Sequence, residues 1–235
     1  MSLLAFIFLI GCDGEKSNVA PSKGSPEEAA AEVKPPEAVS VNPNLKYVIK
    51  GDTVTITGCD KKASGELIIP ANIEGKPVTS IGERAFERCS SLTSITIGNG
   101  VTSIGNGAFG SCIGLTTIEV GTGNVNYTDV EGVLFNKEKT LLHTYPAGKT
   151  GANYVIANNV TSIGIEAFAG CRSLTSITIP ESVTSIGPAA FAGCTSLTTI
   201  EVGAENVNYT DVNGVLFNKE KTVLHTYPAG KTGNY

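Results

Sequence analysis

The stretch from Val160 to Ser182 reads V-T-S-I-G-I-E-A-F-A-G-C-R-S-L-T-S-I-T-I-P-E-S, and it decides the fold. Its first five residues occur four times in the chain, beginning at Val78, Val101, Val160 and Val183. Each copy continues to an A-F-x-x-C segment, and the copies within each half of the chain are 23 residues apart. A fixed period of this length is typical of a solenoid, in which stacked coils bury one another's apolar faces.

This unit predicts the structure of one coil. The segment from Leu174 to Ile179 alternates apolar and polar residues, which predicts a main strand with one buried face. Phe168, Cys171 and Leu174 recur every three residues, which fits one tight helical turn leading into that strand. Gly164 ends the preceding V-T-S-I segment, which we interpret as a short second strand closed by a tight turn. Stacked coils would then align the main strands in a parallel sheet, about 4.8 Å apart.

The repeat resembles the BspA-like leucine-rich repeat, a bacterial variant of the leucine-rich-repeat (LRR) family, with the pattern I-P-x-x-V-x-x-I-G-x-x-A-F-x-x-C-x-x-L-x-x-I-x-I-P. The match covers about residues 65–235 and holds in all four copies. The resemblance implies a single-domain LRR solenoid that is right-handed and mainly β. It also implies a parallel β-sheet and short helical turns, in about six coils.

The residues that precede the array predict a cap. Residues 47–58 alternate apolar and polar side chains around Gly51-Asp52, which indicates a β-hairpin at the N-terminal end of the stack. The run Leu67-Ile68-Ile69-Pro70 aligns with the end of the later main strands, so the first main strand is expected there. We therefore assign residues 45–77 to the N-terminal cap and first strand, and residues 78–235 to the repeat array.

The array also contains a larger duplication. Residues 119–151 and 201–233 differ at only four of 33 positions and are offset by 82 residues. The added material, N-V-N-Y-T-D-V-x-G-V-L-F-N-K-E-K-T-x-L-H-T-Y-P, predicts a hairpin in which 133–135 pairs with 141–143. An array that grows by duplication offers repeated contacts and rarely places a unique catalytic group.

The sequence stops at Tyr235, before the strand that follows the equivalent Tyr154 in the first copy. An uncapped solenoid end exposes apolar surface and an open strand edge. We expect either that the sequence is a fragment or that a partner or a second copy covers this end, which would be self-association through the uncapped C-terminal end.

The N-terminus carries a lipoprotein-like signal. An apolar run over residues 2–10 ends in Leu9-Ile10-Gly11-Cys12, which resembles the lipobox of bacterial lipoproteins. That resemblance implies a signal peptide at residues 1–11 and lipidation of Cys12, and the alternative is a short buried apolar segment. Residues 12–44 hold this cysteine and a Pro-, Ala- and Glu-rich stretch without aromatic residues, which we expect to be a disordered tether.

Several residues of chemically active types are expected to have structural roles. Four cysteines at one repeat position are interpreted as a buried thiol ladder, because a spacing of about 4.8 Å exceeds that of a disulfide. They are Cys89, Cys112, Cys171 and Cys194. No C-x-x-C pair supports a metal site, and Cys59 in the cap is the best candidate for a reactive thiol. The segment from Gly105 to Gly110 fits G-x-G-x-x-G, but only its first glycine recurs in the other repeats, which argues against a dinucleotide site.

Two further patterns belong to the duplicated blocks. His143 and His225 are copies of one position, so neither has a catalytic partner, and we expect both on the hairpin surface. The stretches 129–132 and 211–214 resemble half a calcium loop, but each lies where a hairpin turn is predicted. We interpret both as turns.

The main strands predict a candidate binding face on the side that points away from the core. This face is rich in hydroxyl groups and slightly acidic, and its residues are Ser94, Thr96, Thr117, Glu119, Ser176, Thr178, Thr199 and Glu201. The duplicated hairpins offer a second set of candidate contacts, namely Tyr127, Lys137, Lys139, Tyr145, Tyr209, Lys219, Lys221 and Tyr227. For both sets the alternative interpretation is solvated repeat surface.

Composition and resemblance together predict the function. The formal net charge of −5 argues against nucleic acid as a partner. The BspA-like resemblance implies a non-catalytic, adhesin-like protein that binds host matrix or plasma proteins or another bacterial surface protein. Lipid on Cys12 would anchor it to the bacterial envelope, on the outer surface, and no enzymatic activity, cofactor or metal is expected. The alternative is a structural, scaffolding or glycan-binding lipoprotein that faces the periplasm.

Overall fold

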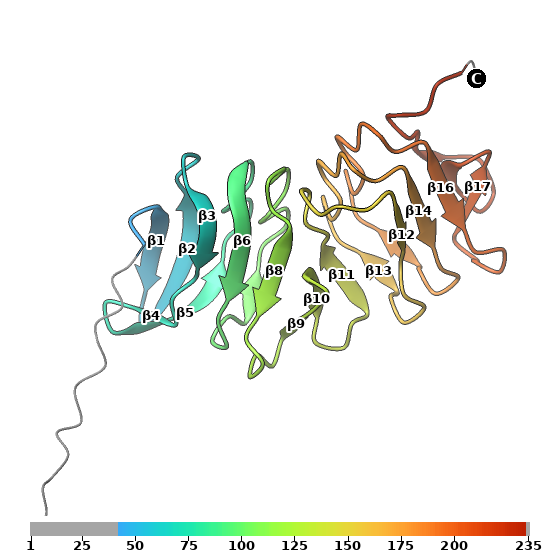
Figure 1. Cartoon of the computed structure of the whole chain (residues 1–235). Coiled ribbons are helices and arrows are strands. Elements are labelled where there is room, and N and C mark those ends of the chain that lie inside the picture. Colours follow the sequence, from blue (N-terminus) through green and yellow to red (C-terminus); the bar gives the residue numbers. More distant parts are fainter. Residues whose placement is uncertain (1–41, 234–235) are drawn as a thin grey trace, which may run out of the picture. The chain divides into compact units, whose positions relative to one another are not determined.

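A computed structural model describes residues 42–233, and within that range the chain is built of strands and turns without a helix (Figure 1). The predicted signal peptide at 1–11, the lipidation of Cys12 and most of the tether lie outside the described residues. The strands stack as a β-solenoid of about six turns, which confirms the predicted LRR fold.

The main strands form two parallel three-stranded sheets. The first holds β3 (Ser64–Ile68), β6 (Ser91–Ile97) and β8 (Thr117–Val120), and the second holds β12 (Asn153–Val155), β14 (Ser176–Ile179) and β16 (Thr199–Val202) (Figure 1). Equal repeat positions pair across the coils, as Ile95 does with Ile118 and Ile177 with Ile200. These isoleucines are fully buried, which confirms the alternation predicted from sequence.

The V-x-x-I segments form the short second strands. They are β5 (Lys76–Ile81) and β7 (Ser103–Ile104) in the first half, and β13 (Ser162–Ile163) and β15 (Ser185–Ile186) in the second. At the N-terminal end, β1 (Leu45–Lys50) and β2 (Thr53–Cys59) form the predicted hairpin, and β2 pairs in parallel with β5. A short β4 (Asn72–Ile73) pairs antiparallel with β5. The hairpin therefore covers one end of the stack of short strands.

Each duplicated block adds an antiparallel meander. In the first block it is β9 (Tyr127–Val130), β10 (Val133–Asn136) and β11 (Leu141–Thr144), and in the second β17 (Tyr209–Val212), β18 (Val215–Asn218) and β19 (Leu224–Thr226). The pairing of β10 with β11 confirms the predicted hairpin. Strand β11 then pairs in parallel with β13, so it acts as the short second strand of an extra coil.

The turn between β9 and β10 ends the first main sheet. Glu131 and Gly132 have φ angles of 51° and 79°, which suit a two-residue hairpin turn. The backbone N–H of Ile118 in β8 donates to the Gly132 carbonyl at 2.9 Å, so the turn occupies the edge where the next main strand would pair. The main strands therefore form two sheets rather than the single continuous sheet expected from the repeat. The turn geometry also explains the calcium-loop-like residues at 129–132 and 211–214.

Strand β10 lies between the two halves of the core. Leu134 packs with the core cluster of the cap and the first coils, whereas Val133 and Phe135 pack with the cluster of the later coils. All three side chains are buried, so both faces of this part of the strand are covered. Because successive side chains of β10 point to opposite sides, this one strand contributes to both core clusters and joins them.

The segment expected to form a helical turn is a run of i→i−3 turns and not a helix. The N–H of Ala85 donates to the Gly82 carbonyl at 3.3 Å, and that of Cys89 to the Phe86 carbonyl at 3.0 Å. The Phe rings of adjacent coils stack, with centroids 5.4 Å apart for Phe86 and Phe109 and also for Phe168 and Phe191. Each turn is therefore fixed by an inward aromatic ring.

Candidate binding surface

The outward residues of the main sheets line up in columns because the strands are in register. In the first sheet one column is Ile68, Thr96 and Glu119, and in the second the equivalent column is Val155, Thr178 and Glu201. We call each set an aliphatic–threonine–glutamate column. Ile68 is 67% exposed and Val155 69%, so each column starts with a large apolar side chain in solvent. Thr96 and Thr178 are 82 residues apart in the chain, and so are Glu119 and Glu201.

A second, more polar column runs beside each of these. It consists of Glu66, Ser94 and Thr117 in the first sheet and of Asn153, Ser176 and Thr199 in the second. In the second sheet the hydroxyl of Ser176 donates to Asn153 Oδ1 at 2.8 Å, and that of Thr178 to Glu201 Oε2 at 3.5 Å. The eight predicted face residues therefore lie together on the two main sheets, four on each, and all are at least partly exposed.

A shallow cleft of about 380 Å³ adjoins the second sheet. Its wall includes Val155 and Thr178 of the aliphatic–threonine–glutamate column, together with Pro180 and Gly203 at the ends of the neighbouring coils. Because the cleft opens beside the exposed Val155, it extends the apolar part of this surface. It offers room for a side chain of a bound macromolecule.

Threonine hydroxyls at the strand margins hold the coils together. Thr116 Oγ1 donates to the Thr93 carbonyl at 3.0 Å, and Thr198 Oγ1 donates to the Thr175 carbonyl at 3.1 Å, 23 residues back in each case. These hydroxyls are engaged in inter-coil hydrogen bonds. They fix the spacing of the columns, which keeps the surface rigid.

Buried asparagines fix the duplicated hairpins at their start. Asn124 Nδ2 donates to the carbonyls of Gly98 and Val101 at 2.9 and 3.0 Å, and its Oδ1 accepts from the N–H groups of Asn126 and Tyr127, both at 2.9 Å. All four bonds recur at the equivalent Asn206 in the second block. Sequence reasoning missed this role, and the signal was an asparagine at equivalent places in both blocks.

The hairpin candidates have diverse roles. The hydroxyls of Tyr127 and Tyr209 accept the backbone N–H groups of Ile104 and Ile186, at 2.9 and 3.1 Å. Tyr145 is only 3% exposed and stacks on Phe168 at 5.3 Å, so it belongs to the core and not to a contact surface. The remaining candidates lie at the surface: Lys137, Lys139, Lys219, Lys221 and Tyr227.

Two of these lysines are tied to nearby backbone. Lys137 Nζ donates to the Asn124 carbonyl at 2.6 Å, and Lys219 Nζ donates to the Ala204 carbonyl at 3.2 Å. Lys139 and Lys221 occupy left-handed turn positions, with φ of 57° and 58°. The hairpin tips therefore present ammonium groups, but the tyrosines beneath them mainly hold the fold.

The two histidines also serve the hairpins. His143 Nε2 lies 3.4 Å from the Ile104 carbonyl, and its ring meets Tyr127 edge-on at 6.1 Å. Burial lowers the pKa of His143 below its usual value, and that of His225 in the same way. Both histidines are partly buried, so the expected surface position holds only in part for each. Together Tyr127 and His143 contact both backbone polar groups of Ile104, at the edge of β7.

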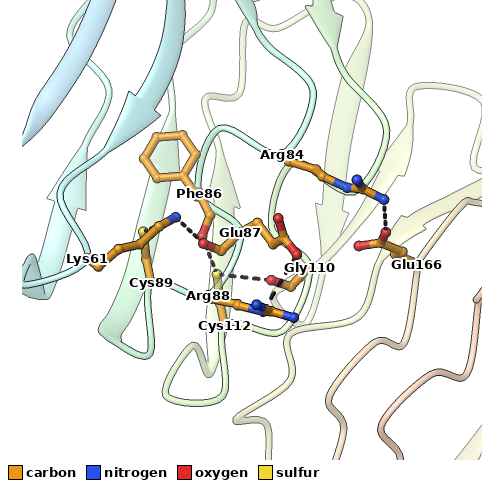
Figure 2. Close-up of polar contacts among 9 residues, drawn as sticks. All are labelled: Lys61, Arg84, Phe86, Glu87, Arg88, Cys89, Gly110, Cys112 and Glu166. Atoms are coloured by element: carbon orange, nitrogen blue, oxygen red, sulfur yellow. Dashed lines mark hydrogen bonds and ion pairs between the residues drawn. The ribbon is translucent and has the colours of Figure 1, made fainter.

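The G-x-G-x-x-G segment has a packing role. Glu166 and Arg84 form an ion pair at 2.7 Å, and the Glu166 carboxylate lies over the segment (Figure 2). A Cβ atom at Gly107 would come 2.8 Å from Glu166 Oε2, and one at Gly110 would come 2.5 Å from it. These two glycines therefore make room for a carboxylate of the following repeat, which explains why they depart from the repeat consensus.

The cysteines of the repeat are buried and reduced, as predicted for a thiol ladder. Cys112 Sγ lies 2.9 Å from the Phe86 carbonyl (Figure 2). In the second half Cys194 Sγ lies 3.1 Å from the Phe168 carbonyl, and in both cases the carbonyl belongs to a residue 26 positions earlier. Each of these thiols thus donates to a carbonyl of the preceding coil. Burial raises the pKa of Cys112 to about 12, so that thiol is inert at neutral pH.

Among residues 42–233 there is no group of three or more His, Cys, Asp or Glu side chains placed to hold a metal ion. Buried side-chain nitrogen and oxygen atoms in this range all have a hydrogen-bond partner. A search of the same range finds no helix with the length and apolar character needed to span a bilayer.

Known proteins place this architecture in a family. The profile described as BspA type leucine rich repeat region matches in six copies, over residues 66–145 and 148–224. A solved leucine-rich repeat protein from Eubacterium ventriosum is 20% identical, with 69% of this chain and 71% of that chain covered and a TM-score of 0.45.

Two further solved structures are similar. A leucine rich cell surface protein from Faecalibacterium prausnitzii is 25% identical, with 76% of this chain and 57% of that chain covered and a TM-score of 0.39. A leucine-rich repeat protein from Bacteroides ovatus is 29% identical, with 68% and 40% covered and a TM-score of 0.44. No curated protein matches the chain significantly.

Proposed function

Because the chain belongs to the BspA-type leucine-rich-repeat family, we propose that it is a non-catalytic binding protein of the bacterial cell surface. Its repeat array contacts other macromolecules through the outer face of the main sheets. The ligand class is a host matrix or plasma protein, or a surface protein of another bacterium. Proteins of this family are repeat scaffolds, and a scaffold of this kind contributes an extended surface rather than a pocket.

The duplicated aliphatic–threonine–glutamate column carries this proposal. Each column presents an exposed apolar side chain, a hydroxyl group and a carboxylate, in that order, and the chain holds two such columns. Neither column contains Trp, Tyr or Arg, the residues that dominate tight single sites. We therefore expect weak contacts at each column and a large gain when both engage one partner.

The polar chemistry of the column defines the partner further. Glu119 and Glu201 are exposed, and a carboxylate at the end of an apolar column favours a basic side chain next to an apolar one. A partner that repeats such a pair would engage both sheets. Extended matrix proteins with repeated domains meet this requirement.

Lipidation of Cys12 is part of the same proposal. The anchor would fix the array to the membrane, and residues 12–44 would serve as the tether between them. One acyl chain alone binds a membrane weakly, whereas a multiply acylated N-terminal cysteine anchors stably. Metabolic labelling with an alkyne fatty acid, comparing wild type with Cys12→Ala, tests this step. Label on the variant would exclude the anchor.

Binding experiments test the role of the face. Glu119→Lys and Glu201→Lys reverse one exposed charge in each column, and the double variant reverses both. Against immobilised matrix and plasma proteins, each single variant should bind a few-fold more weakly and the double variant about a hundredfold more weakly, as avidity is lost. Ser103→Lys and Ser185→Lys are the matched controls, since these exposed serines lie on β7 and β15 in the short-strand sheets. Equal losses in controls and face variants would refute the assignment.

Self-association through the C-terminal coils is a separate part of the proposal. Leu224 in β19 is 54% exposed, whereas the equivalent Leu142 is fully buried and pairs with β13. In this proposal a second copy pairs with the exposed β19. Sedimentation of wild type and Leu224→Lys tests this, and a monomer at every concentration would rule it out.

A further inference from the structure

One thiol of the ladder has an environment unlike the others. The Sγ atoms of Cys112 and Cys194 lie within 3.1 Å of a carbonyl acceptor, whereas those of Cys171 and Cys89 lie 3.8 and 4.0 Å from the carbonyls of Tyr145 and Asp60. The ammonium group of Lys61 lies 3.9 Å from the same sulfur (Figure 2). Cys89 is therefore a repeat cysteine with a nearby cation and without a close carbonyl bond.

Cys59 is the partner of this thiol. It ends β2 of the cap, directly before Asp60, whose carbonyl lies 4.0 Å from Cys89 Sγ, so the two cysteines meet where the cap joins the first coil. Both side chains are almost fully buried, at 4% and 0% exposed, beneath the exposed Lys61. Two thiols that approach each other at the junction of the cap and the first coil have the placement needed to form a covalent bond.

The local charges favour the thiolate of Cys89. The hydrogen bond from Cys59 and the positive charge of Lys61 lower the pKa of Cys89 to about 7, against the opposing effects of burial and of the Asp60 carboxylate. The same pairing raises the pKa of Cys59. The pairing therefore makes Cys89 the more readily ionised and more nucleophilic of the two thiols, and it favours the protonated form of Cys59.

We propose that Cys59 and Cys89 form a disulfide that fastens the N-terminal cap to the first repeat coil. The oxidant is a peroxide, which is small enough to reach sulfur atoms under one side chain. The Cys89 thiolate attacks one oxygen of hydrogen peroxide, the O–O bond breaks, and Cys89 becomes a sulfenic acid while the other oxygen leaves as hydroxide and is protonated by solvent to water. The Cys59 thiol then attacks the Cys89 sulfur, the S–S bond forms, and the sulfenic hydroxyl leaves with the Cys59 proton as a second water.

The other close thiol pair lacks the activating group. Cys171 and Cys194 are also hydrogen-bonded to each other, but no cation acts on either sulfur. Both are enclosed by coils, and Cys194 is tied to the Phe168 carbonyl. Cys112 is held in its protonated form by burial. The bond is therefore specific to the junction with the cap, where a Cys59–Cys89 link would close a loop of residues 59–89.

Peptide mapping after peroxide treatment tests the proposal on the full chain. Purified protein is treated with hydrogen peroxide at pH 7, free thiols are blocked with iodoacetamide, and tryptic peptides are identified by mass. We expect one linked pair, Cys59 with Cys89, lighter than the sum of its peptides by two hydrogen atoms. The link should also form in Cys171→Ser and be absent from Cys59→Ser and Cys89→Ser.

A second variant separates the role of Lys61 from that of packing. Lys61→Gln keeps a long polar side chain but removes a charge that lowers the pKa of Cys89, so less thiolate is present and the linked pair should form several-fold more slowly at pH 7. Circular dichroism confirms that each variant is folded. The proposal is overturned if wild type gives only over-oxidised Cys89, if Cys171 and Cys194 link equally fast, or if Lys61→Gln has no effect on the rate.

Discussion

Arg84 Nη2 and Glu166 Oε1 lie 2.7 Å apart, although 82 residues separate them in the chain. Both occupy the same position of the repeat, in the first and third V-T-S-I-G copies, with left-handed φ angles of 52° and 56°. The copy between them has Gly107 at that position, and the Glu166 carboxylate lies over it. The charge pair therefore spans the intervening V-T-S-I-G copy, because that copy has no side chain at this position.

This pair predicts a salt-dependent coupling between the halves of the array. Arg84→Ala and Glu166→Ala should each lower the melting temperature slightly, and the double variant should lose less than the sum of the two. The coupling should weaken in about 1 M NaCl, where the screening length falls to about 3 Å. Thermal melts of the four proteins at low and high salt measure it. Additive losses at low salt would show that the contact contributes nothing.

The aromatic stack predicts a large loss on truncation of Phe168. Its side chain is fully buried and stacks between Tyr145 and Phe191, with centroids 5.3 and 5.4 Å away. Phe168→Ala should cost about 3–5 kcal/mol of unfolding free energy, as for other buried aromatic truncations. Urea titration measures the loss, with the exposed Ser185→Ala as control. A loss below about 1 kcal/mol would mean that the ring is outside the core.

The buried Asn206 predicts an effect out of proportion to its size. Its Nδ2 donates to the carbonyls of Pro180 and Val183, and both distances are 2.9 Å. Asn206→Ala leaves these carbonyls unpaired, so we expect a loss of about 2–4 kcal/mol in urea titration. The neighbouring, exposed Asn208→Ala is the control and should change little. Equal stabilities of the two variants would contradict the role given to Asn206.

The partly buried His143 predicts acid sensitivity. Burial lowers the pKa of His143 in the folded chain, whereas the unfolded chain keeps the ordinary value of about 6.5. Below that pH the unfolded chain binds more protons, so the stabilising contribution of neutral His143 is present above it and is lost as the pH falls.

The melting temperature of His143→Gln should therefore fall less than that of the wild type when the pH is lowered from about 7 to about 5, the range around the ordinary histidine pKa. His225→Gln is the internal comparison and should differ less from the wild type, since the ring of His225 is less deeply packed. If both variants kept the wild-type pH profile, neither histidine would be buried in neutral form.

Much of the fold follows from local patterns. The alternation around Ile177 predicts a strand with one buried face, and the Gly51-Asp52 pair predicts the cap hairpin, because both depend only on neighbouring residues. The break in the main sheet could not be predicted in this way. It depends on the Gly132 carbonyl reaching Ile118, a contact between segments that share no repeat position.

The site was predicted only in part. Strand alternation placed Thr178 and Glu201 on the outer face correctly, but it did not show that Val155 heads their column, because β12 departs from the repeat consensus. Tyr145 was misplaced for a similar reason. Phe86, a member of the aromatic stack, stands 26 positions before the repeat cysteine Cys112. Tyr145 stands 26 positions before Cys171, and this spacing indicates that it too belongs to the stack of aromatic rings in the core.

The proposed surface location is tested most directly by protease treatment of intact and lysed cells that carry the protein, with antibody detection of residues 45–235. If the array faces outward, its signal disappears from intact cells while a cytoplasmic control protein persists. If the array is protected in intact cells and digested only after lysis, it faces the periplasm or cytoplasm, and the surface-binding account is contradicted.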